Sequence, residues 1–271
     1  MNKSYYYLVG GLFFLILLIL AQPLLAGQKF ADFQRIHSGS GLTLHKEMFL
    51  LPFTYSSEYD NQQIEAVFQV SAKHRIFGTR LYFAYTQISF WQAYDSENSA
   101  PFRETNYNPE LFYRFKPFKY EGGRIGADLG FEHESNGQIP PVSRSWNLFY
   151  LCPYYQKANF LIYFKFRYRV PEESKKTPDD PEGDDNPDIT DFYGYNDINL
   201  YYKLPHNNSV HIKGYGNIAT GKGGFFAMYS IPIPKSENSF FTIRISHGFG
   251  ESLVDYNKSL SRVGIGISFM Q

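Results

Sequence analysis

Residues 124–135 read RIGADLGFEHES, and this stretch decides the fold. Apolar residues occupy every second position, and the residues between them are small or acidic. The apolar set is Ile125, Ala127, Leu129 and Phe131. A period of two is typical of a β-strand with one apolar and one polar face, which suits a strand of a transmembrane barrel. The same register carries His133 and Ser135 onto the apolar face, so a base and a hydroxyl would share the surface that meets lipid.

The N-terminus reads as a secretory signal peptide. Lys3 precedes an apolar run from Leu8 to Leu20, and small residues around Ala26 offer a cleavage site before Gly27. A permanent membrane anchor is the alternative. No later stretch reaches the roughly 18 apolar residues of a membrane helix, and the mean hydropathy of the chain is −0.36. Helical membrane spans are therefore not expected after the signal.

Twelve later stretches of about 9 to 14 residues have strand character, close to the length of a tilted barrel strand. The expected strands are 47–56, 63–73, 79–91, 107–117, 124–135, 146–156, 160–170, 192–204, 209–218, 223–233, 239–248 and 261–270. An aromatic content of 19% also suits a barrel, whose rims favour tyrosine. We therefore predict an all-β fold, a twelve-stranded antiparallel transmembrane β-barrel. A soluble β-sandwich would have the same period but would put its polar face outside.

This strand pattern divides the chain into three segments. We expect residues 1–26 to be removed as the signal peptide, residues 27–46 to form an N-terminal periplasmic segment, and residues 47–271 to form the outer-membrane barrel. The link from Leu204 to Ser209 is short, whereas the link over 171–190 is long, acidic and rich in proline. Short turns are expected on the periplasmic side and long loops outside. The acidic residues of the long link lack the spacing of a calcium-binding EF loop, which favours a solvated loop.

The charge balance of the chain bears on the kind of partner it could bind. The formal net charge is zero, which argues against a nucleic-acid partner. The single cysteine, Cys152, is best explained as a small strand hydrophobe.

Cations alternate with aromatic residues at Lys165, Arg167 and Arg169, and we expect them inside the barrel, balanced by carboxylates. We also expect acidic residues of the decisive strand to join this interior network rather than to form a glycosidase carboxylate pair; these are Asp128, Glu132 and Glu134.

Two residues apart on one face, His133 and Ser135 could act as base and nucleophile. A serine hydroxyl becomes reactive when an imidazole takes its proton, and a further acceptor must hold that imidazole in the correct tautomer. Asn147 opens the next expected strand and can supply this acceptor. A His-x-Ser pair is weak evidence by itself, so the surrounding sequence has to decide.

Four stretches of the chain resemble the bacterial outer-membrane phospholipase A family. They are FEHESNGQIPPVSRSWN from Phe131, SAPFRETNYNPELF from Ser99, DDNPDITDFYGY from Asp184 and GFGESLVDYN from Gly248. The resemblance covers most of the mature chain. It implies a twelve-stranded outer-membrane barrel that hydrolyses acyl esters of membrane phospholipids, requires Ca²⁺ and becomes active as a homodimer.

The resemblance also implies site residues. Ser135 matches the family nucleophile, His133 the general base, and Asn147 the residue that orients the base. Gly137 matches the position whose backbone N–H contributes to the oxyanion site. Gln87 matches a family position at the subunit interface; a lumen-facing glutamine is the alternative.

The same resemblance implies calcium ligands. The Ser143 side chain and the Gln138 carbonyl would bind the ion, together with the Ser99 carbonyl from the partner subunit. Family members can carry an aspartate where this chain has Pro140, and with Asp185 it would form a second calcium site. Proline has no carboxylate, so this chain lacks one of the two acidic residues of that second site. The alternative to an enzyme is an outer-membrane pore or a structural barrel, which has no need of a serine, a histidine and an asparagine in this register.

Overall fold

The computed structural model describes residues 33–39, 41–57, 64–177, 180, 182–236 and 238–269. The expected signal peptide lies outside these residues. The chain divides into residues 1–31 and residues 32–271, and all of the described residues belong to the second unit. Among the described residues, no helix has the length and apolar character needed to span a membrane.

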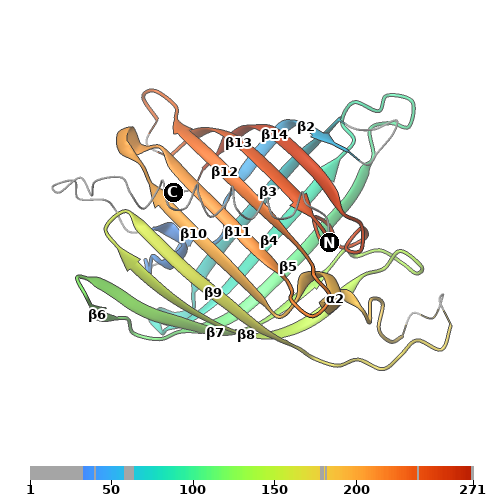
Figure 1. Cartoon of the computed structure of the whole chain (residues 1–271), viewed down its shortest axis with the longest axis horizontal. Helices are drawn as coiled ribbons and strands as arrows, with labels where there is room; N and C mark the ends of the chain where they lie inside the picture. The colour runs from blue at the N-terminus through green and yellow to red at the C-terminus, as the bar shows by residue number, and fades with distance from the viewer. Residues whose placement is uncertain are drawn as a thin grey trace. The chain divides into compact units, whose positions relative to one another are not determined.

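Within the described residues, twelve antiparallel strands form the wall of a closed barrel (Figure 1). They are β2 (Phe49–Ser56), β3 (Ile64–Arg75), β4 (Leu81–Trp91), β5 (Phe102–Arg114), β7 (Gly123–Ser135), β8 (Ser145–Lys157), β9 (Phe160–Arg169), β10 (Asn196–Lys203), β11 (Ser209–Asn217), β12 (Lys222–Pro232), β13 (Phe240–Gly248) and β14 (Leu260–Ser268). Each strand pairs with the next, and β14 pairs with β2. The predicted twelve-stranded barrel is confirmed, and the β-sandwich alternative is wrong because the sheet closes on itself.

Two short strands extend this wall. The strand β1 (Leu42–Leu44) pairs with β3 beyond the end of β2, and β6 (Phe118–Tyr120) pairs with β7 beyond the end of β5. The fourth strand was predicted over 107–117, but β5 runs from Phe102. Its first residues are polar because they face the lumen, where Glu104 and Asn106 are buried.

The two faces of the wall differ as the period of two predicts. Leu129 and Phe131 are exposed, whereas Asp128, Gly130 and Glu132 are buried or face inward. Charged side chains inside the barrel are paired across strands. The pairs are Arg114–Asp128 (2.8 Å), Lys165–Glu132 (2.6 Å) and Arg167–Asp197. Breaking such pairs leaves an uncompensated charge, so they fix the strands relative to one another.

The N-terminal segment enters the barrel. The 3-10 helix η1 (Gln34–Ile36) is flanked by Phe33, and both Phe33 and Arg35 are buried. Lys73 on β3 donates to the carbonyl oxygens of Gln34 (2.7 Å) and Leu44 (2.5 Å). The described residues 33–36, which belong to the expected N-terminal periplasmic segment, therefore pack inside the barrel.

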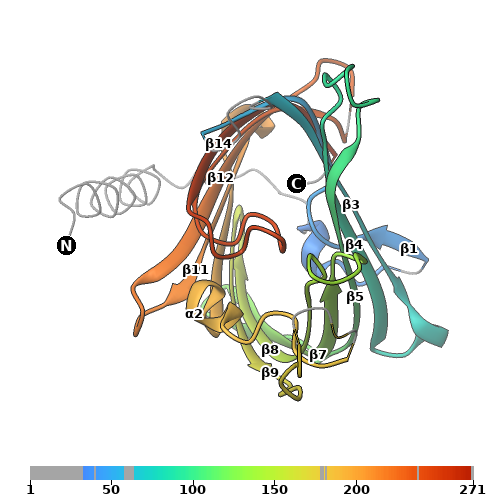
Figure 2. The same cartoon turned by 90° about the vertical axis from the view of Figure 1, so that its right-hand side faces the viewer.

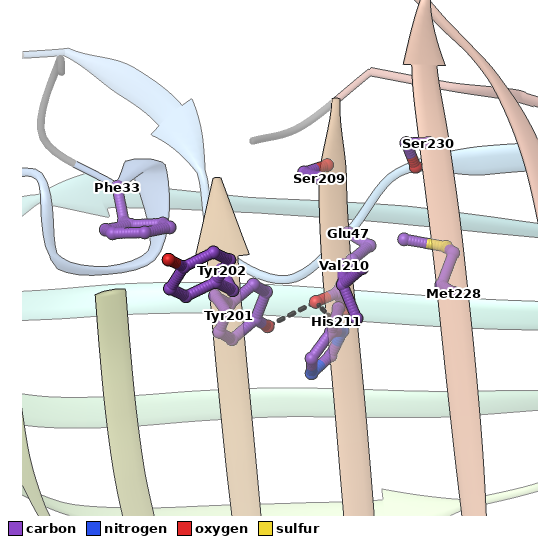
Figure 3. Close-up of a pocket in the computed structure, with 9 residues that line it drawn as sticks. All are labelled: Phe33, Glu47, Tyr201, Tyr202, Ser209, Val210, His211, Met228 and Ser230. Atoms are coloured by element: carbon purple, nitrogen blue, oxygen red, sulfur yellow. Dashed lines mark hydrogen bonds and ion pairs between the residues drawn. The ribbon is translucent and has the colours of Figure 1, made fainter. Parts of the chain in front are cut away.

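A small polar contact lies next to this segment (Figure 3). Glu47 accepts a hydrogen bond from the Tyr201 hydroxyl and lies 2.5 Å from Nδ1 of His211. The adjoining cavity of about 10 Å³ has room for roughly one water molecule. His211 is therefore a wall residue with structural partners.

At the opposite end of the barrel lies an apolar group that we call the mouth cluster. It consists of Trp146, Leu148, Ile189, Phe192, Leu253 and Tyr256. These residues come from the inner face of β8, from α2 (Ile189–Tyr193) and from the link between β13 and β14, which folds over the opening in Figure 2. The Tyr256 hydroxyl donates to Asp188, and burial together with this contact raises the pKa of Tyr256.

Candidate active site

The register of β7 and β8 brings the predicted site residues together. His133 is the cross-strand partner of Asn147, and Ser135 is the partner of Ser145. All four are half-buried and have the parity of the exposed residues Leu129 and Phe131, so they lie on the outer face of the barrel. The prediction that a base and a hydroxyl share the exterior surface agrees with this geometry.

The imidazole of His133 has a defined partner. Its Nδ1 lies 2.9 Å from Oδ1 of Asn147. Because an amide oxygen only accepts, Nδ1 must donate, and Nε2 keeps the lone pair that a general base needs. In the described part of the chain, the Ser135 hydroxyl makes no hydrogen bond to His133. Contacts of this kind are often long before substrate binds.

The inner face of the same strands supports the pair. Glu134 lies between His133 and Ser135 but points inward, where its carboxylate accepts a 2.9 Å hydrogen bond from the Trp146 indole. Trp146 is only 1% exposed and belongs to the mouth cluster. This contact joins β7 to β8 directly behind the outer residues and holds their register.

The turn after β7 is built around Asn136. Its side-chain oxygen accepts hydrogen bonds from the backbone N–H of Gln138 (3.2 Å) and of Arg144 (2.9 Å), and its amide nitrogen donates to the Val142 carbonyl (2.8 Å). Gly137 has a φ of +64°, and a Cβ there would lie 3.1 Å from the Tyr107 ring. Glycine suits this backbone conformation, and Gly137 follows Ser135 by two residues in the chain.

The residues expected to bind calcium are only partly assembled in the described structure. The Ser143 hydroxyl donates to Oδ2 of Asp185 (2.6 Å), while the other oxygen of Asp185 lies 2.5 Å from the ammonium of Lys175. Ser99 is exposed in the link between β4 and β5, where its φ is +61°. The described residues contain no group of three or more histidines, cysteines or carboxylates that could hold a metal.

Gln87 lies on the outer face of β4, so the lumen-facing alternative is wrong. It is the cross-strand neighbour of Tyr107, which in turn pairs with Ser135. At about 4.8 Å per strand, the Cα atoms of Gln87 and Ser135 are roughly 10 Å apart. The Gln87 side chain accepts from the Tyr85 hydroxyl (3.0 Å) and donates to Ser89 (3.2 Å).

Sequence reasoning missed several neighbours of the site. Glu172 accepts a hydrogen bond from Asn147, and Lys175 pairs with Asp185. Glu172 and Lys175 come from the long link after β9, which has no periodic pattern to reveal them. Strand parity could have identified Tyr107. The opposite wall of the barrel carries a second outer pair, in which His247 Nδ1 lies 2.8 Å from the Ser261 hydroxyl. Within the described chain no asparagine bonds to that imidazole, which makes the pair a natural control.

Sequence comparisons match this chain to one family model and to relatives with the same description. A family model described as Phospholipase A1 matches residues 31–269. A putative phospholipase A1 of Neisseria meningitidis is 35% identical over 258 residues, which cover 84% of this chain but 65% of that protein. Phospholipase A1 of Klebsiella pneumoniae is 33% identical over 266 residues, which cover 91% of this chain and 88% of that protein.

Two solved structures share the barrel. Outer membrane phospholipase A from Escherichia coli superposes with a TM-score of 0.75 at 33% identity, covering 84% of this chain and 98% of that one. A Salmonella typhi outer membrane phospholipase, a dimer with bound calcium, has a TM-score of 0.75 at 32% identity, covering 87% of this chain and 94% of that one.

Proposed function

Because this chain belongs to the phospholipase A1 family, we propose that it hydrolyses acyl esters of membrane phospholipids by a Ser-His-Asn mechanism, with calcium and after two barrels associate. Its location in the bacterial outer membrane follows from the barrel and from the relatives named for that membrane. The contact between His133 and Asn147 on the outer face, in register with Ser135, carries the proposal.

In the proposed reaction, the Ser135 hydroxyl oxygen attacks the acyl carbonyl carbon while Nε2 of His133 takes its proton. The ester C–O bond breaks, and His133 gives the proton to the departing lysophospholipid oxygen. Water then attacks the acyl-enzyme with His133 again as the base, which releases the fatty acid and restores Ser135. Asn147 holds the neutral imidazole in the required tautomer and keeps the ring in the same orientation when it carries the proton.

Negative charge develops on the carbonyl oxygen in both steps. The N–H of Gly137, in the turn directly after Ser135, is the proposed donor to this oxygen. A calcium ion, when bound, would add to this stabilisation by polarising the oxyanion.

The proposed calcium ligands are the Ser143 side chain and the Gln138 carbonyl, joined by the carbonyl of Ser99 of the partner subunit. The donor set fits, because hydroxyl and carbonyl oxygens are among the ligands that calcium prefers, and the Asp185 carboxylate lies beside this set, 2.6 Å from the Ser143 hydroxyl. Pro140 has no side-chain oxygen, so Asp185 would be the only acidic residue of a second site.

Association of two barrels has a physical rationale. On a lone barrel the outer site faces mobile lipid tails, whereas a second barrel would form a cleft that holds them. Gln87 and Ser135 share one row of the wall, so a partner seated on Gln87 would border the site. Gln87 makes two hydrogen bonds inside its own barrel, which leaves half of its capacity for a partner.

The pore alternative finds little support, because paired charges, the N-terminal segment and the mouth cluster occupy the lumen. Fatty-acid release from phospholipid in mixed micelles, with calcium, tests the proposal. We expect turnover by the native protein, none with Ser135→Ala, and native turnover with the matched control Ser261→Ala. A native protein inactive at every calcium concentration would contradict the function, and substantial turnover by Ser135→Ala would contradict the nucleophile.

A further inference from the structure

The orienting residue Asn147 is itself held by a carboxylate. Its side-chain oxygen lies 2.9 Å from His133, and its amide nitrogen donates to Oε1 of Glu172 at 3.2 Å. Glu172 belongs to the link after β9 and is half-buried. The structure therefore shows a chain of three side chains, from the imidazole through the amide to a carboxylate.

We propose that Glu172 is a positioning residue that fixes the amide of Asn147, and through it the tautomer of His133. This inference rests on the proposed function and extends it to a residue outside the Ser-His-Asn set.

The chemistry of the three groups supports one arrangement. An ionised carboxylate only accepts hydrogen bonds, so it must face the NH₂ group of Asn147. The amide oxygen then points at Nδ1 of His133. If the amide turned over, its NH₂ would face Nδ1, the ring proton would move to Nε2, and the base that Ser135 needs would be lost. Glu172 makes the productive orientation the favoured one.

The backbone holds Glu172 in place from both sides. On one side, the Val170 N–H donates to the carbonyl of Asn147 itself at 2.8 Å. On the other, the Glu173 carbonyl accepts from the Asp184 N–H at 2.7 Å. Gly183 permits this closure, because its φ is +98° and a Cβ there would lie 2.9 Å from the Glu173 oxygen. The position of residue 172 is thus set between two anchored neighbours.

A double-mutant cycle on the full-length protein tests the inference. We expect Glu172→Ala to lower kcat about five- to tenfold, the order expected for a hydrogen bond to a partly exposed charged group, with KM unchanged because Glu172 does not touch lipid. Glu172→Gln keeps an accepting oxygen, so its loss should be smaller. In an Asn147→Ala background, Glu172→Ala should cause no further loss, because the group through which it acts is gone.

The matched control is Glu173→Ala, which removes a neighbouring exposed carboxylate and keeps the backbone carbonyl; native kcat is expected. Equal losses from Glu172→Ala with and without Asn147 would overturn the inference, as would a native kcat in Glu172→Ala. Circular dichroism of each variant identifies a folding defect, in which case the Glu172→Gln arm of the cycle decides. An inactive native protein would instead contradict the proposed function, so the two failures are distinguishable.

Discussion

Replacing Lys175 with methionine should tighten calcium binding. The Lys175 ammonium lies 2.5 Å from one oxygen of Asp185, and these side chains are only 13% and 11% exposed. The other carboxylate oxygen accepts the Ser143 hydroxyl. A divalent cation that uses Asp185 must therefore displace the lysine. Breaking an exposed ion pair costs about 1 kcal/mol, which is a lower bound for this largely shielded pair, and the displaced ammonium would still repel the cation. We expect calcium affinity to rise about five- to tenfold, since 1.36 kcal/mol corresponds to a tenfold change.

Isothermal titration of calcium into the detergent-solubilised protein measures this affinity directly, and the half-saturating calcium concentration for lipid hydrolysis gives a second value. Lys176→Met is the matched control, because it removes the same charge from the next, exposed residue. Affinity that is unchanged relative to this control, or weaker, would refute the competition between Lys175 and calcium.

Three further outcomes are expected. Asn147→Ala should reduce fatty-acid release less than Ser135→Ala does, because the amide orients the base without accepting the proton; equal losses would make the orienting role too modest. Gln87→Leu should weaken the dimer by about 1 kcal/mol, the loss of one or two hydrogen bonds, and a calcium-dependent crosslinking yield equal to the native one would contradict this. Asp128→Asn should lower the free energy of unfolding by about 3 kcal/mol, because it leaves the buried guanidinium of Arg114 without its carboxylate; urea unfolding in detergent measures the change, and a native midpoint would contradict it.

The period of two was enough to predict the barrel wall and the outer position of His133 and Ser135, because parity along a strand does not depend on the rest of the fold. It failed at the start of β5. There, Arg103 and Glu104 have the composition of a loop, but they lie in a strand because Arg103 pairs with Glu65 inside the barrel. A polar stretch can therefore form part of a strand when its charged side chains are paired inside the barrel.

Contacts between strands and links were harder to predict. The pairing of His133 with Asn147 depends on the register across the turn after β7, which Asn136 sets with its own hydrogen bonds. Glu172 and Lys175 reach the site only because the link after β9 folds back on itself at its base. Nothing in the spacing of an irregular acidic segment encodes that closure.

The contact between Trp146 and Glu134 has a consequence for how this protein fails under stress. The imidazole and the hydroxyl lie on the outer face of two strands, and the mouth cluster lies on their inner face. Only the backbone of these strands separates the two. Heat or denaturant that loosens the mouth cluster would shift the imidazole from its amide partner while the remaining strands still form a closed barrel. Turnover should then be lost at a lower temperature than the one at which the whole barrel unfolds. The inactivation temperature would report the local stability of this end of the barrel.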